Sequence, residues 1–410
     1  MLRIAPFRAL RPRPEYAPQV ASVPYDVVNT EEARELAEGN PHSFLHVVRP
    51  EIDLPDDTDP YDDAVYAKAK ENLDRLREDE ILVQDAEPKL FLYRQVMEHR
   101  SQVGIVCCCH VDDYVNDLVK KHEKTRQAKE DDRTRHVLTL NANAGPVFLT
   151  YRDQPEINRM VQDAMNDRPI YHFNAPDGVT HTAWAITNAG SFVEAFKSKV
   201  PCAYVADGHH RSASAARAGA ERRAANPRHT GEEEYNWFLA VLFPTSELNI
   251  LPYNRIIRDL NGLTADQVLS HLSAVGSVES TDRPEPERPG VFCFYIGRQW
   301  YRLEIDPQTI DQDDPIESLD VAILQHRVLE PIFRIGDPRT DPRIDFVGGI
   351  RGTKELERLV DQTKAACAVS MHHTTIDQLL SVADAGLIMP RKSTWFGPKL
   401  RSGLFVHLLD

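Results

Sequence analysis

The sequence lacks several features that would place it in a familiar class. No stretch approaches the roughly 20 apolar residues of a membrane-spanning helix, and the first residues, MLRIAPFRALRPRP, contain no long apolar core. None of the six cysteines belongs to a CxxC pair, which argues against a zinc ribbon. These absences predict a cytoplasmic protein whose cysteines, three of them consecutive at 107–109, are buried reduced thiols.

Three motifs of metal and nucleotide enzymes are also missing. The segment HEKTR (122–126) lacks the second histidine of HExxH because Arg126 occupies that position, so a zinc protease is not supported. The segment GGIRGTKE (348–355) lacks the GK[ST] ending of a P-loop, and the chain contains no GxGxxG.

Positive charge is in short supply. The 410 residues include 48 Lys and Arg against 63 Asp and Glu, which gives a formal net charge of −15. This balance works against broad nonspecific binding of nucleic acid, which needs a basic surface. A local basic pocket for a phosphorylated small molecule remains compatible with it.

Hydrophobic patterns predict a mixture of about eight strands and about eight helices, hence an α/β or mixed α+β fold with mixed sheets and flanking helices. Residues 61–80 show helical periodicity, and 89–97 and 101–111 resemble a strand pair. A hairpin is expected within 291–306. Two proline-rich stretches, 49–60 and 280–290, are either surface loops or boundaries, so one unit over 1–410 is expected, with lobes at 1–85, 86–279 and 290–410.

The segment YVADGHHRSASA (204–215) predicts a strand that breaks at Gly208 and leads into a helix from about Ser212. A helix start directs unpaired N–H groups outward and attracts anions, and Arg211 adds a fork-shaped cation. Phosphate binding and a plain capped turn both fit this pattern. Asp207, His209 and His210 are too crowded to bind a metal alone.

The segment 117–136 is densely charged. As a helix it would pair Glu123 with Arg126, Arg126 with Glu130, and Glu130 with Arg133, and charge pattern alone favours such a solvated helix. The alternative is phosphoryl transfer, which needs cations for phosphates, a carboxylate base and carboxylates for magnesium. The residues that would supply these groups are Glu123, Lys124, Arg126, Lys129, Glu130, Asp132 and Arg133.

Two further segments are rich in turn and polar residues. MPRKSTWFGPKLRSGL (389–404) cannot form a regular helix, and its aromatic and glycine content favours an ordered lid over a surface extension. SVPYDVVNTEE (22–32) predicts a turn followed by a helix that Asn29 or Thr30 caps with Glu32 nearby. Tyr25 and Asp26 lie at that turn.

Five motifs together resemble a bacterial family known as domain of unknown function 1015. They are PYDVV (24–28), KKHEKTRQAKEDDR (120–133), ADGHHRSASA (206–215), LPYNR (251–255) and MPRKSTWFGPKLRSGL (389–404). The resemblance runs from end to end, with Arg391 where a second proline is expected and Ser212 where an aromatic is common. The strand–DGHHR–helix element is similar to one in the ParB/sulfiredoxin-like superfamily, whose free-serine kinases use a glutamate base beside a histidine.

The resemblance implies a nucleotide-dependent phosphotransferase that acts on a small hydroxylated metabolite, with free serine or phosphoserine first to test, in either direction. Expected cofactors are ATP or ADP and Mg2+. The implied catalytic residues are His122, Glu123 as general base, Arg126, Lys129 and Arg133, and Glu130 and Asp132 would bind magnesium. The implied nucleotide-binding residues are Asp207, Gly208, His209, His210, Arg211, Ser212, Lys392, Ser393, Thr394 and Lys399. The implied substrate-binding residues are Tyr25, Asp26, Asn254 and Arg255.

Two other classes stay open. The same phosphate site would serve a nucleotide-binding regulator or a ParB-like nucleic-acid protein, although the net charge makes nucleic acid an unfavoured partner. A metal-dependent hydrolase or nuclease would instead use the His and Asp residues. The expected partners are a small-molecule substrate and a nucleotide, with no membrane, and the sequence leaves a homo-oligomer open.

Overall fold

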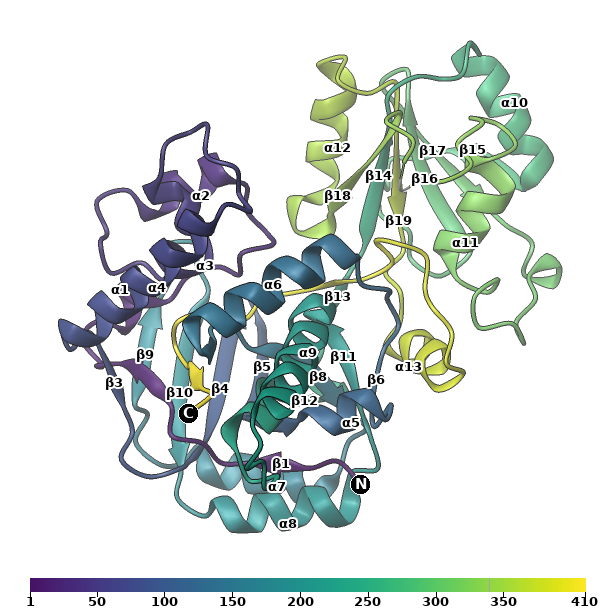
Figure 1. The fold of residues 1–410 in the computed structure, drawn as a ribbon. Coiled ribbons are helices and arrows are strands. Elements are labelled where there is room, and N and C mark those ends of the chain that lie inside the picture. Colours follow the sequence, from purple (N-terminus) through teal and green to yellow (C-terminus); the bar gives the residue numbers. More distant parts are fainter. Residues whose placement is uncertain (339) are drawn as a thin grey trace. The chain divides into compact units, whose positions relative to one another are not determined.

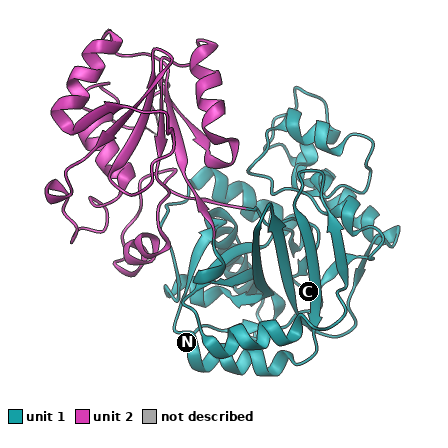
Figure 2. Ribbon diagram, turned by 180° about the vertical axis from the view of Figure 1, so that it is seen from behind, with its two compact units in different colours: residues 1–248, 398–410 teal, residues 249–397 magenta. Residues whose placement is uncertain are grey.

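The computed structural model describes residues 1–338 and 340–410, which divide into two compact units (Figure 1, Figure 2). Unit 1 consists of residues 1–248 and 398–410, and unit 2 of residues 249–397. We call residues 398–410 the C-terminal strap. The lobes expected at 1–85, 86–279 and 290–410 of one family-wide unit stay a prediction.

Unit 1 is built on a nine-stranded mixed sheet. Its strands in spatial order are β6 (Val119–Lys120), β11 (Ala203–Asp207), β8 (Val147–Tyr151), β12 (Trp237–Pro244), β5 (Arg100–His110), β4 (Leu90–Met97), β10 (Thr180–Ile186) and β9 (Tyr171–Asn174), with β1 (Ile4–Ala5) paired to β5. The pairs β6–β11 and β8–β12 are parallel, and β4–β5 is the antiparallel pair that the sequence predicts. The mixed sheet confirms the expected fold class.

Helices flank this sheet. They are α1 (Ala17–Val20), α2 (Thr30–Ala37), α3 (Leu45–Val48), α4 (Asp63–Glu78), α5 (Val111–Val115), α6 (Gln127–Leu140), α7 (Pro155–Ala164), α8 (Ala189–Lys199) and α9 (His209–Ala225). The side-chain alternation of β5 sends Cys107 and Cys109 into the same core as Phe196 of α8 and Ala216 of α9. All six cysteines are free and five are buried, as expected, while Cys202 is partly exposed.

A second core of unit 1 joins the N-terminal helices to the C-terminal strap. Leu45 of α3 and Leu73 of α4 share it with Val406 and Leu408. Two short strand pairs border it: β2 (Leu10–Pro12) with β3 (Leu82–Gln84), and β21 (His407–Leu408) with β7 (Ala142–Asn143). The start of α2 is the expected capping box, in which Asn29 and Glu32 each accept the other's backbone N–H.

Unit 2 contains a six-stranded antiparallel sheet. Its strands in spatial order are β15 (Ser277–Ser280), β17 (Gln299–Glu304), β16 (Val291–Ile296), β19 (Cys367–Met371), β14 (Tyr253–Ile257) and β18 (Ile344–Gly348). The other elements are α10 (Ala265–Val275), α11 (Asp320–Leu324), α12 (Gly352–Asp361), α13 (Ile376–Asp384) and the pair β13 (Ile250–Leu251) with β20 (Trp395–Phe396). The expected hairpin is the pair β16–β17.

Two expectations are wrong. The described residues form 21 strands and 13 α-helices rather than about eight of each, because many elements have only two to five residues and leave no periodic pattern. The charged segment 117–136 is not one helix, because α6 begins only at Gln127. Residues 121–126 precede it, and there the backbone N–H of Arg126 donates to His210 Nε2 at 3.1 Å.

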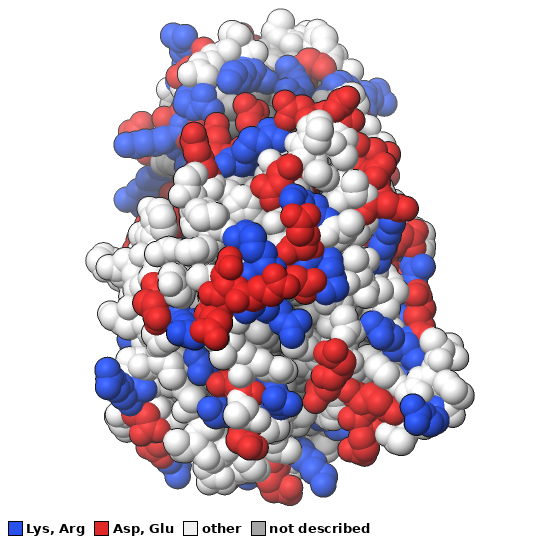
Figure 3. Space-filling model, turned by 60° about the vertical axis from the view of Figure 1, so that its left-hand side comes forward, with Lys and Arg blue, Asp and Glu red and all other residues white. Residues whose placement is uncertain are grey.

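Two surface observations complete the description. In the described part of the chain, no helix is both long and apolar enough to cross a membrane. Figure 3 shows Lys and Arg side chains interspersed with Asp and Glu over the face that it presents. On this face, charge of one sign does not gather over a broad area.

Candidate functional site

The start of α9 in unit 1 has the geometry of an anion site. Strand β11 ends at Asp207, and Gly208 turns the chain with φ 96, a left-handed conformation that favours glycine. The N–H of Ser212 is the donor of a helix bond to Gly208 O at 2.9 Å. In a helix start the N–H groups before that first bond have no partner within the helix, so those of residues 208–211 are the donors available to an anion.

Asp207 holds two cations at this helix start. Its Oδ1 lies 3.2 Å from Lys399 Nζ, and its Oδ2 accepts a hydrogen bond from Arg211 at 2.9 Å. Burial alone would raise the pKa of this carboxyl, but the charges of Lys399 and Arg211 outweigh burial and hold the pKa well below its usual range. Arg211 also donates to Pro146 O at 2.5 Å and lies 3.7 Å from Asp26.

The C-terminal strap carries Lys399 to this place. Two buried glutamines of the sheet bind its backbone: Gln95 donates to Lys399 O at 2.8 Å, and Gln102 donates to Pro398 O at 3.2 Å. Arg401 anchors the next turn through Asp177 and through His181 Nε2 at 3.3 Å. The sequence predicts an ordered segment here, and these contacts give its order a physical cause.

A pair of buried histidines lies beside the helix start. The rings of His122 and His209 meet edge to face with centroids 4.5 Å apart, and the residues are only 3% and 6% exposed. Burial lowers the pKa of His122 to about 4, and burial together with the neighbouring His122 lowers the pKa of His209 well below its usual value. His122 Nδ1 and His209 Nε2 are buried without a hydrogen-bond partner among the described residues. Both rings are therefore neutral near pH 7, and each has a nitrogen that no described group satisfies.

Glu123 lies next to this pair. Its Oε2 is 4.0 Å from His209 Nδ1, and its side chain is 46% exposed, so solvent and ligands can reach it. A partly exposed carboxylate beside a neutral imidazole is a suitable proton acceptor.

His210 ties α9 to the segment before α6. Its Nε2 accepts the backbone N–H of Arg126, so the ring carries its proton on Nδ1 when it is neutral. Burial lowers the pKa of His210, and the charges of Arg126 and Lys129 lower it further. The side chain of Ser212 is buried and donates to the carbonyl oxygens of Gly208 and His209 at 3.2 and 3.1 Å. The predicted phosphate bond of Ser212 would have to replace these helix bonds.

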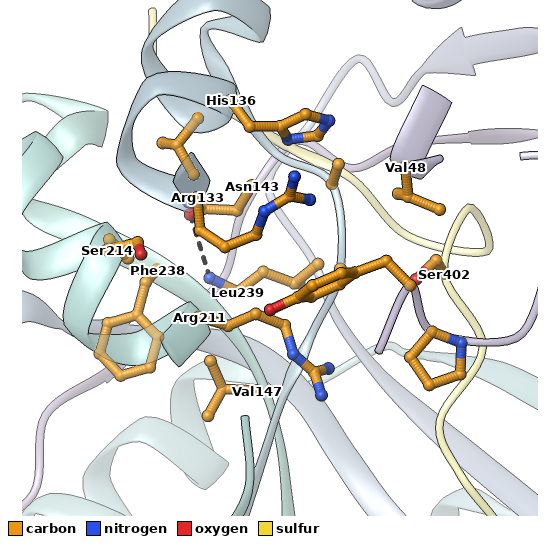
Figure 4. A pocket seen from close by; sticks show the side chains of 16 residues that line it. Val48, Arg133, His136, Asn143, Val147, Arg211, Ser214, Phe238, Leu239 and Ser402 are labelled. Atoms are coloured by element: carbon orange, nitrogen blue, oxygen red, sulfur yellow. Dashed lines mark hydrogen bonds between the residues drawn. The ribbon is translucent and has the colours of Figure 1, made fainter. Parts of the chain in front are cut away.

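A small pocket with about 40 Å³ of free space lies between α6, α9 and the strap (Figure 4). Arg133 from α6 and Arg211 from α9 both line it, and the Arg133 guanidinium lies 4.4 Å from the ring centre of Tyr25. Burial and the adjacent Asp26 raise the pKa of Tyr25 to about 12, so its hydroxyl stays protonated. The other polar residues that line the pocket are His136, Asn143, Ser214 and Ser402, of which the sequence singled out only Ser214, as a possible phosphate ligand. Ser214 and Ser402 lie within two of the motifs, whereas His136 and Asn143 lie outside all five.

The two carboxylates predicted for magnesium are already engaged. Asp132 accepts from Arg133 with both oxygens at 3.0 Å and from Tyr66 at 2.9 Å. Glu130 accepts from Thr125 at 3.0 Å. Within the described ranges, no group of three or more His, Cys, Asp or Glu residues is arranged to bind a metal ion. The pair does not fit a magnesium site as it stands, and magnesium there stays a prediction.

The remaining predicted residues belong to unit 2. Asn254 is buried and accepts the N–H of Met371 at 3.0 Å, and Arg255 donates to Lys392 O at 3.1 Å. Ser393 donates to Pro390 O, and Thr394 follows it. The predicted residues thus form one group in unit 1 and another in unit 2. That the residues of unit 2 contribute to the site at the start of α9 stays a prediction.

Comparisons with known proteins give a family and distant structural likenesses. The family described as "Protein of unknown function (DUF1015)" matches residues 4–322, and no curated protein matches the chain. A conserved hypothetical protein from Pyrococcus furiosus is 13% identical, with 74% of this chain and 95% of that chain covered and a TM-score of 0.35. A free serine kinase in complex with AMP is 12% identical, with 73% and 92% covered and a TM-score of 0.35.

A third similar structure is SbnI with C-terminal truncation from Staphylococcus aureus, 10% identical, with 73% of this chain and 87% of that chain covered and a TM-score of 0.37. At such low TM-scores and identities, these likenesses carry no argument about the function of this chain.

Proposed function

The chain belongs to the DUF1015 family of unknown function, and we propose that it is a nucleotide-dependent phosphotransferase that acts on a small hydroxylated metabolite. One observation carries the proposal: the start of α9, with Arg211 and Lys399 held on Asp207, lies beside a reachable carboxylate, Glu123. Phosphoryl transfer needs a phosphate cradle and a proton acceptor close together.

The phosphate cradle is the first turn of α9. Its backbone N–H groups and the helix dipole attract anions, and Arg211 and Lys399 add two positive charges. Asp207 fixes both cations in place, so their ordering does not have to accompany binding. A Cβ at position 208 would lie 3.1 Å from Arg211 Nε, so the absence of a side chain there keeps the approach to the guanidinium open.

Glu123 is the general base of the proposal. It takes the proton of the acceptor hydroxyl, whose oxygen can then attack phosphorus while the bond to the leaving phosphate oxygen breaks. His209, neutral and 4.0 Å away, lies beside the carboxylate without a hydrogen bond to it, and the ring of His122 packs against the ring of His209. Because His122 is buried, we assign it a positioning role.

The lining of the small pocket beside α9 suits a negatively charged group of the acceptor. Arg133 and Arg211 face it together with the protonated hydroxyl of Tyr25, which fits a carboxylate such as that of free serine or phosphoserine. Arg126 and Lys129 lie close enough to His210 to lower its pKa, and in this proposal they add positive charge near the transferred phosphoryl group. A bound ATP or ADP would supply or receive the phosphoryl group, and the direction of transfer is part of what the assay below decides.

The test is an assay of the purified full chain for ADP formation from ATP with serine, and for ATP formation from ADP with phosphoserine. Arg211→Gln removes the fixed cation of the cradle and is expected to lower turnover at least about 100-fold, as loss of a transition-state donor does. The matched control is Arg217→Gln on the exposed face of the same helix, which should retain parental turnover.

Folding of both variants is checked by thermal melting and circular dichroism, because only 10% of the Arg211 side chain is exposed. Parental turnover in a folded Arg211→Gln protein would contradict the proposal. Nucleotide binding without transfer to any hydroxylated metabolite would favour the nucleotide-binding regulator instead.

A further inference from the structure

Unit 2 contains a pocket of about 400 Å³ that opens to solvent and is formed by residues of this unit alone. Tyr253 of β14 and Phe346 of β18 form its aromatic wall, and their rings meet edge to face. Arg391 and Lys392 line it from the segment that follows α13. Its size lies in the range of small-molecule sites, and its lining is mostly polar, with two aromatic rings beside it.

The lining of this pocket contains two basic and two acidic side chains, and arginines outside the lining neutralise the acidic pair. The two acidic lining residues are each paired with an arginine, Asp341 with Arg343 at 2.6 Å and Asp345 with Arg258 at 3.2 Å. Arg391 and Lys392 have no carboxylate within ion-pair distance in the described part of the chain. An excess of cations in a chain of net charge −15 is a local feature that favours an anionic ligand.

A buried arginine lies directly behind the wall. Arg255 is 4% exposed, and its guanidinium lies 5.0 Å from the ring centre of Phe346. It donates to the carbonyl oxygens of Tyr253 and Lys392 rather than to a carboxylate. Burial lowers the pKa of Arg255 to about 10, which still leaves it charged near pH 7. A buried cation without a counter-charge is costly, and a nearby anion would compensate it.

The backbone at Lys392 is also unusual. Its φ is 60, in the left-handed region that non-glycine residues rarely adopt, and Arg255 holds its carbonyl at 3.1 Å. Such a conformation persists only where surrounding structure fixes it, and it is frequent at ligand sites. Here it fixes the turn that brings Arg391 and Lys392 to the pocket.

We propose that this pocket of unit 2 is an anion site that binds the phosphate group of a small molecule, with Arg391 and Lys392 as its direct ligands. Arg255 is a positioning residue that fixes the turn and adds its charge from behind. Tyr253 and Phe346 offer an apolar surface to the part of the ligand that carries the phosphate. This site is separate from the one at the start of α9 and does not depend on the proposed phosphotransferase function.

Hydrogen exchange of the full chain, followed by mass spectrometry with and without inorganic pyrophosphate, locates binding. The proposal predicts slower exchange in residues 340–348 and 388–394. The double variant Arg391→Gln/Lys392→Gln should lose this protection and raise the pyrophosphate concentration for half-protection at least about tenfold. The matched control, Arg351→Gln/Lys354→Gln, makes the same charge change on exposed positions of unit 2 and should keep the parental response.

The same measurement separates the two sites, because protection at residues 207–215 reports on α9. The proposal is supported if the double variant loses protection at 340–348 and 388–394 while exchange at 207–215 is the same as in the parent. This result does not depend on whether the α9 site binds a nucleotide. Absence of protection in the first two segments of the parent, or its persistence in the double variant, overturns it. A second titration uses ADP in place of pyrophosphate. Half-protection at the same concentration would show that the site recognises the phosphates alone. Half-protection at a lower ADP concentration would show that the nucleoside also contacts the site.

Discussion

Lys399 Nζ lies 3.2 Å from Asp207 Oδ1, although the whole of unit 2, residues 249–397, separates the two residues in the sequence. Gln95 and Gln102 hold the backbone of the strap at this point, and Arg211 binds the other oxygen of Asp207. The ion pair therefore joins the end of the chain to the start of α9. It makes the charge of the candidate phosphate site depend on the docking of the strap.

Replacing Lys399 tests this dependence. Lys399→Gln leaves a largely buried carboxylate with only one cation, and we expect it to lower the free energy of unfolding by about 2 kcal/mol, less than for a fully buried pair. Urea denaturation measures the change, and Lys197→Gln on the exposed face of α8 is the control. An unchanged free energy of unfolding would show that the pair does not anchor the strap.

The buried histidines predict a pH dependence of stability. Burial lowers the pKa of His122 to about 4 in the folded protein, whereas an unfolded chain protonates near its ordinary value of about 6.5. As pH falls between these values, the unfolded state binds the proton and the folded state does not, so stability is lost. The expected loss from His122 is about 2 kcal/mol from about pH 6.5 to about pH 5.

Comparison of His122→Asn with the parent by urea denaturation at several pH values isolates this contribution. The variant should show a shallower fall in stability over that interval, while His99→Asn at an exposed turn should follow the parent. Parallel curves for His122→Asn and the parent would contradict the buried neutral histidine.

A substitution at Gly208 can separate the effect of backbone strain on stability from the effect of an added side chain on ADP binding. Gly208→Ala forces a side chain into a left-handed conformation, at a cost of about 1 kcal/mol in stability, and puts its Cβ 3.1 Å from Arg211 Nε. Gly39→Ala is the matched control, since φ is also positive there but nothing lies near the added Cβ. Both variants should lose similar stability in thermal melting, and only Gly208→Ala should lose ADP affinity by calorimetry, about tenfold or more. Equal ADP affinity in both would argue against phosphate at the helix start.

Local signals explain what the sequence predicts correctly. The apolar run of β11, the break at Gly208 and the alanine-rich α9 need only neighbouring residues to be recognised, although the helix starts at His209 rather than near Ser212. The β4–β5 pair and the capping box at Asn29 are local in the same sense.

Long-range contacts explain what the sequence could not predict. Residues 121–126 have the charge spacing of a helix. The backbone N–H of Arg126 instead donates to the side chain of His210, and α6 begins only at Gln127. The edge-to-face packing of His122 on His209 and the pocket residues Asn143 and Ser402 depend on tertiary structure. The motifs contain several residues of the site, such as His122 and His209, but only the tertiary structure shows which of their side chains are in contact.

The most direct test of the phosphotransferase proposal is Glu123→Gln, measured by two readouts on one sample. The variant should bind ADP within about threefold of the parental affinity by calorimetry, because Glu123 does not belong to the cradle. Phosphate transfer between nucleotide and serine should fall at least about 100-fold, as expected for loss of a general base. The exposed Glu38→Gln is the control. Parental transfer rates in Glu123→Gln would contradict the account.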